Sequence, residues 1–170
     1  MERRYSAIRY LAYIIEIIVF YSLSSTPGLI PNIFGGAPIF LLPIAITIAV
    51  FENEISGMFI GLFCGILLDV CGSYSQGFFA ITLAILCFFL GFLSDNYIKI
   101  KFLTIIFTAV LIIVVLLSLH FFFFFVLQDY SDSGWFFMQH YLSRIICTIA
   151  VTPIIYFLNK LLAENIREQA

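Results

Sequence analysis

Long apolar stretches follow one another along this chain, with only short polar segments between them. Residues 102–127, for example, contain no Asp, Glu, Lys or Arg. A helix needs about 20 apolar residues to cross the ~30 Å hydrocarbon core of a bilayer. The composition agrees, because 63% of the residues are hydrophobic and only 11% are charged. In soluble domains about 45–50% of the residues are apolar and about 25% are charged. The sequence therefore predicts an integral membrane protein.

The hydropathy pattern predicts an all-α fold, a single domain over residues 1–170 built as a compact bundle of about six transmembrane helices. The second helix is short and contains Pro43, so we expect it to tilt little or to lie partly at the membrane interface. Pro43 and Pro153 are both expected to kink the helices that contain them. The expected spans are residues 7–25, 38–51, 54–70, 77–94, 102–127 and 135–162.

The basic residues predict the orientation, because Lys and Arg concentrate in cytoplasmic loops. With six spans, almost all of them fall on one side, and the loops of the other side carry aspartates. Both termini are therefore expected in the cytoplasm. A cleaved signal peptide is the alternative for the first apolar run, but Glu16 in its middle and a weak cleavage site oppose it. The basic residues on the cytoplasmic side are Arg3, Arg4, Arg9, Lys99, Lys101, Lys160 and Arg167.

Three glycines and an aspartate are spaced four residues apart in "EISGMFIGLFCGILLD". Gly57, Gly61, Gly65 and Asp69 therefore form one row on a helix with 3.6 residues per turn. Rows of small residues let helices approach closely in lipid, so another helix is expected against this row. That helix is either part of this chain or part of a partner. Asp69, at the end of the row, is expected to bond to a neighbouring loop or helix N-terminus.

Two further acidic residues, Glu52 and Glu54, precede the glycine row. We expect them in a tight cytoplasmic turn, solvated or paired with a lysine. The candidate lysines are Lys99, Lys101 and Lys160.

Glu16 and Arg144 are charged residues inside expected spans. Each is about nine residues from an end of its span, and an unpaired charge there costs at least ~2.5–3.5 kcal/mol. A Glu16–Arg144 contact that joins the first span to the sixth is our hypothesis. The alternatives are that Arg144 reaches outward to Asp129 or Asp132, or that it faces a polar cavity.

The remaining polar residues predict no cofactor, no metal site and no enzyme. His120 and His140 have no metal-binding spacing, and hydrogen bonds to loop groups explain them better. Ser143 has no defined general base. No basic cluster interleaved with aromatic residues suggests nucleic acid. The cysteines form no CxxC pair and are expected to be buried thiols, apart from one at a helix end; they are Cys64, Cys87 and Cys147, with Cys71 nearest to water.

The row G-x3-G-x3-D, followed by a glycine-rich turn and Gly77, resembles the signature region of the MreD family of rod shape-determining membrane proteins. The chain length, the six spans and "TPIIYFLNKLL", which contains Pro153, fit as well. The resemblance implies a non-catalytic scaffold of the bacterial cytoplasmic membrane that serves lateral cell-wall synthesis. Its implied partners are MreC, the glycosyltransferase RodA and its transpeptidase, and indirectly MreB filaments.

A second class of protein shares this architecture. The substrate-binding subunit of energy-coupling-factor vitamin transporters is also small, with six spans and little mass outside the membrane. It would need a polar pocket near Asp69, His120 and His140. The first span, however, lacks the small-residue row that would dock a coupling subunit. An intramembrane enzyme is a third alternative, with Glu16, Asp69 and Arg144 as its candidate groups.

Overall fold

The computed structural model of this chain is an all-helical bundle. It describes residues 2–26, 38–71, 77–96, 102–126 and 141–167, and these ranges contain no strand. The predicted all-α fold is therefore confirmed for the described part of the chain. The elements are α1 (Glu2–Ser25), α2 (Leu41–Phe51), α3 (Glu54–Cys71), α4 (Phe78–Asn96), α5 (Phe102–Phe121), the π-helical turn η1 (Phe122–Val126) and α7 (Leu142–Arg167).

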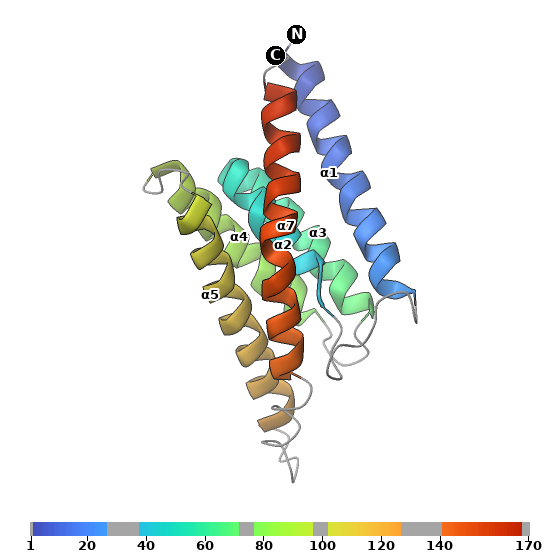
Figure 1. The fold of residues 1–170 in the computed structure, drawn as a ribbon, viewed down its shortest axis with the longest axis vertical. Coiled ribbons are helices and arrows are strands. Elements are labelled where there is room, and N and C mark those ends of the chain that lie inside the picture. Colours follow the sequence, from blue (N-terminus) through green and yellow to red (C-terminus); the bar gives the residue numbers. More distant parts are fainter. Residues whose placement is uncertain (1, 27–37, 72–76, 97–101, 127–140, 168–170) are drawn as a thin grey trace.

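The helices run up and down through the bundle, and the beginning of α1 lies at the same end as the end of α7 (Figure 1). Helix α1 starts five residues earlier than expected, and α7 continues to Arg167, beyond the expected end at residue 162. The first part of the expected sixth span, residues 135–140, lies outside the described residues. Helices α3 and α4 form the most extensive helix pair.

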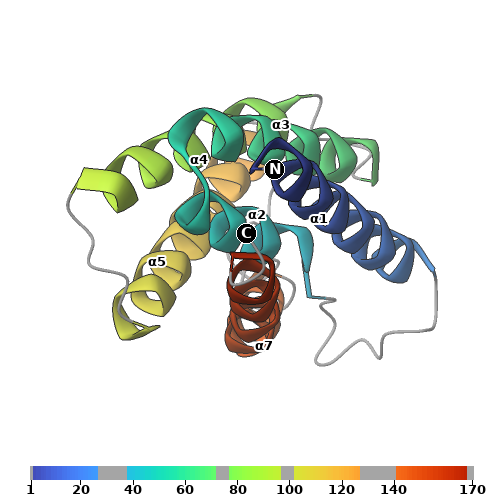
Figure 2. The ribbon, with the colours of Figure 1, turned by 90° about the horizontal axis from the view of Figure 1, so that it is seen from above.

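The short helix α2 lies at the centre, and the other helices are arranged around it (Figure 2). Every residue from Leu41 to Val50 is buried. A helix that is apolar all round is buried in this way, and α2 contains no charged residue. Its 11 residues rise about 16 Å, which is about half the hydrocarbon thickness. The expected second span over residues 38–51 is thus a short central helix covered by protein.

Pro43 is the third residue of α2. The N–H groups of the first helical turn have no partner within the helix, so proline loses no hydrogen bond there. The prediction that Pro43 kinks a helix is wrong, because it stands where the helix begins. Pro153, in contrast, lies inside α7, which continues on both sides of it.

The outward faces of the surrounding helices are strongly apolar. Val70 on α3 is 72% exposed and Phe107 on α5 is 71% exposed, and similar side chains cover α1, α4 and α7. Among the described residues, Thr104–Phe124 and Leu142–Ala163 are long and apolar enough to cross a membrane. Apolar surface this extensive is not typical of a soluble monomer.

Candidate functional site

The glycine row of α3 is buried inside the bundle. A Cβ atom at Gly61 would lie 2.7 Å from Cys87 Sγ, and one at Gly65 would lie 2.6 Å from the carbonyl oxygen of Phe79. Both distances are shorter than side-chain packing allows, so α4 lies against the bare backbone of α3. The sequence left open whether the helix against this row belongs to this chain or to a partner. In the structure it is α4 of the same chain.

Helix α4 supplies small residues in return. A Cβ atom at Gly91 would lie 2.6 Å from Cα of Glu54, and Ala80 lies against Gly65. This half of the contact was not predicted from the sequence, although "AITLAILCFFLG" shows Ala80, Ala84, Cys87 and Gly91 at helical spacing. We call the whole contact the glycine seam; it consists of Gly57, Gly61 and Gly65 on α3 and Ala80, Cys87 and Gly91 on α4.

Asp69 ends the glycine seam by capping α4. Its Oδ1 accepts a hydrogen bond from the N–H of Phe79 at 3.2 Å, and its Oδ2 accepts one from the N–H of Ala80 at 2.9 Å. These N–H groups lie in the first turn and have no acceptor within the helix, and a carboxylate is favourable at the positive end of the helix dipole. The expected bond from Asp69 to a helix N-terminus is confirmed.

Gly77, the last residue of the predicted signature, precedes α4 directly. Its φ of +83° lies in the left-handed region, and nothing lies within 4 Å of the place where a Cβ would stand. Its carbonyl accepts the N–H of Ile81 at 3.2 Å. Glycine is therefore required there by the backbone conformation and not by close packing.

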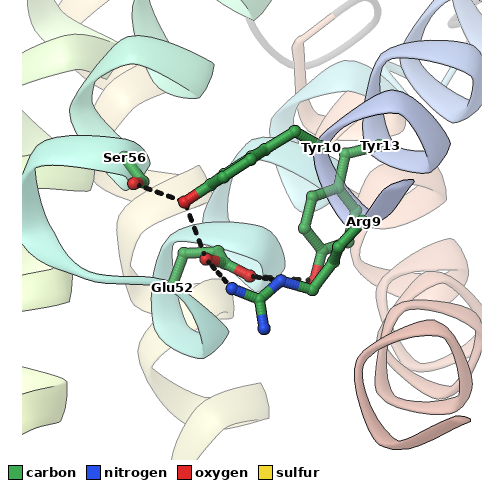
Figure 3. A network of polar contacts seen from close by, with 5 residues as sticks. All are labelled: Arg9, Tyr10, Tyr13, Glu52 and Ser56. Atoms are coloured by element: carbon green, nitrogen blue, oxygen red, sulfur yellow. Dashed lines mark hydrogen bonds and ion pairs between the residues drawn. The ribbon is translucent and has the colours of Figure 1, made fainter. Parts of the chain in front are cut away.

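A second group of contacts, here named the polar clasp, joins α1 to the turn between α2 and α3 (Figure 3). Arg9 Nε lies 2.7 Å from Glu52 Oε1, and Arg9 Nη2 donates to Oε2 at 2.9 Å. The hydroxyls of Tyr10 and Tyr13 both donate to Glu52 at 3.3 Å. Tyr10 also lies 2.8 Å from Ser56 Oγ.

The polar clasp corrects one of the two expectations for Glu52, that it is solvated. Its side chain is only 3% exposed and that of Arg9 is 19% exposed, so Glu52 is not solvated. From the sequence alone, Arg9 was interpreted only as a basic residue that orients the chain. The signal that was available is a tyrosine pair beside a basic residue, "RYLAY", which places Arg9, Tyr10 and Tyr13 on neighbouring positions of one helix face.

The predicted contact between Glu16 and Arg144 does not form. Neither carboxylate oxygen of Glu16 has a hydrogen-bond partner in the described part of the chain, and the Arg144 side chain is exposed. Arg144 is the third residue of α7, near the end of the helix and not nine residues deep. Glu16 lies about 14 Å of helix rise from Ser25, the end of α1. The two side chains therefore stand at different depths.

Helix α7 holds the central helix through buried polar groups that the sequence analysis did not select. Asn159 Nδ2 donates to Thr47 Oγ1 at 2.8 Å, and the N–H of Ile39 donates to Thr148 Oγ1 at 3.1 Å. Thr47, Thr148 and Asn159 are fully buried. Polar residues within otherwise apolar stretches were the available signal, because such residues need partners inside a bundle.

The aromatic end of the bundle surrounds His120. Its Nδ1 lies 2.9 Å from the Tyr141 hydroxyl, and its ring stacks on Phe79 and Phe124 with centroids 4.8 Å from each. His140 lies outside the described residues. In the part of the chain that the structure describes, no group of three or more His, Cys, Asp or Glu residues is placed to hold a metal ion.

The polar clasp, the Asp69 cap and the Asn159–Thr47 bond each join separate segments of the bundle. Comparison of the chain with protein-family models, with curated proteins and with solved structures finds no match in any of the three.

Proposed function

We propose that this chain is a polytopic integral membrane protein that acts as a non-catalytic scaffold for other membrane proteins. In the form that the resemblance to the MreD family implies, it sits in the bacterial cytoplasmic membrane with both termini inside. It would bind MreC there and, through it, RodA and its transpeptidase, with MreB filaments coupled indirectly.

The observation that carries this proposal is the division between the inside and the outside of the bundle. The glycine seam, the polar clasp and the Asn159–Thr47 bond all lie between helices of this chain. The outward faces carry large apolar side chains such as Phe59, Phe107 and Phe157. Such faces contact lipid or the apolar helices of partners.

A pull-down of the tagged full-length chain from native membranes, with mass spectrometry of the recovered proteins, tests the proposal. The outward-facing substitutions Ile14→Ala on α1 and Phe59→Ala on α3 alter the surface, since these residues are 47% and 60% exposed. Recovery of cell-wall elongation proteins, reduced by one of these changes at equal expression, would support a scaffold with a defined docking face.

Gly61→Leu is the matched control for folding, because Gly61 is internal. It should lower the amount of folded protein, and the recovery of all partners should fall in the same proportion. Recovery of an ATPase module with a coupling subunit, or of a bound vitamin, would overturn the scaffold proposal in favour of a transporter subunit.

A further inference from the structure

Glu16 is a buried carboxylate that the contacts between helices do not use. It lies on α1 with only 7% of its surface exposed. Within the described part of the chain, neither Oε1 nor Oε2 has a hydrogen-bond partner. The polar clasp and the cap of α4 satisfy their carboxylates with cations or N–H groups, so Glu16 differs from Glu52 and Asp69.

The groups around Glu16 offer no compensating positive charge. Tyr13, three residues earlier on α1, donates its hydroxyl to Glu52. The guanidinium of Arg9 is paired with Glu52 as well. Helix α3 contributes the buried thiol of Cys64, and α2 contains no titratable residue. Across the described residues, including those of α7, no cation lies within ion-pair distance of the Glu16 carboxylate.

A carboxylate buried in this way is stable only when it gains a cation or becomes neutral. We propose that Glu16 is a proton-binding site, at which the chain holds one proton on a neutral carboxylic acid inside the bundle. The ligand is the proton itself, because the surrounding groups do not form a metal site.

This proposal concerns burial within the chain and does not depend on the scaffold function. Isotope-edited infrared spectroscopy of the purified full-length protein in lipid nanodiscs at neutral pH tests it. With ¹³C-labelled glutamate, we expect a label-sensitive carbonyl band of a protonated carboxylic acid. The band should disappear in Glu16→Gln and remain in the control Glu54→Gln, which changes a partly exposed carboxylate.

If Glu16→Gln does not fold, Glu16→Asp replaces it, and the band should then move from the glutamate-labelled to the aspartate-labelled sample. Absence of a protonated carboxyl band in the wild-type protein would overturn the proposal. Persistence of the band in Glu16→Gln, or its failure to change label in Glu16→Asp, would overturn it equally.

Discussion

The glycine seam makes a graded prediction, because the three glycines of α3 have different room for a methyl group. A Cβ at Gly57 would lie 3.2 Å from the Cα and Cβ of Ala49. One at Gly61 would lie 2.7 and 2.8 Å from Sγ and Cβ of Cys87, and one at Gly65 would lie 2.6 and 2.7 Å from the Phe79 carbonyl oxygen and the Ala80 nitrogen. Replacement by alanine should therefore become more harmful from Gly57 to Gly65.

The magnitude follows from two opposing effects. Alanine in the middle of a helix is more stable than glycine by roughly 0.5–1 kcal/mol, and overpacking costs about 1–3 kcal/mol. At Gly65 the obstructing atoms belong to the backbone of α4, so the whole helix must move and we expect a net loss of about 2 kcal/mol. At Gly61 the nearest atoms belong to a side chain, and a loss of about 1 kcal/mol is expected. At Gly57 the two effects nearly cancel.

Thermal unfolding of the purified variants in one detergent measures this order. A loss of about 2 kcal/mol corresponds to about 4–8 °C in a chain of this size. In a double-mutant cycle, Cys87→Ala should recover part of the loss caused by Gly61→Ala, because it removes the sulfur atom. Equal losses at the three positions, or no loss for Gly65→Ala, would refute the packing that we describe.

Three further perturbations test other contacts. Asp69→Ala should lower stability by about 1 kcal/mol, measured by thermal unfolding, because two N–H groups of α4 lose their acceptor; an unchanged midpoint would contradict the cap. Gly77→Ala should lower the free energy of unfolding by about 1–2 kcal/mol, because of the positive φ alone. Asparagine tolerates that conformation, so Gly77→Asn should lower stability less in the same assay. Glu52→Gln should cost about 3 kcal/mol by leaving Arg9 without its carboxylate, and adding Arg9→Met should restore much of the loss in chemical denaturation; additive losses would argue against the ion pair.

The sequence alone predicted the elements whose signal is local. Regular apolar stretches predicted the helices. The four-residue spacing from Gly57 to Asp69 predicted a closely packed helix face that ends in an acid bonded to a loop or to a helix N-terminus. Both follow from helical periodicity, which requires no knowledge of the neighbouring helix. The neighbour itself was beyond prediction, because whether α4 or a partner meets the glycines depends on how the helices are arranged in space.

The failures concern pairs of residues that are far apart in the sequence. A contact between Glu16 and Arg144 was predicted because both are charged residues inside expected spans. The depth of Arg144, however, depends on where α7 begins, and that start was not predicted correctly. Arg9 and Glu52 are 43 positions apart, and hydropathy contains no information on which of several basic residues reaches a given acid. Helix α2 was expected to tilt little or to lie partly at the membrane interface because it is short and contains Pro43, but its burial depends on distant helices such as α7.

The position of α2 has a consequence for how the protein is made. Its neighbours include α7, and the bond from Asn159 to Thr47 joins residues 112 positions apart. A ribosome that has synthesised α2 must still complete α3, α4, α5 and α7 before the central helix is enclosed. The side chains from Leu41 to Val50 are all buried, so their burial depends on those later helices. A nascent chain that stops before α7 would expose α2, and quality-control proteases would be expected to degrade it.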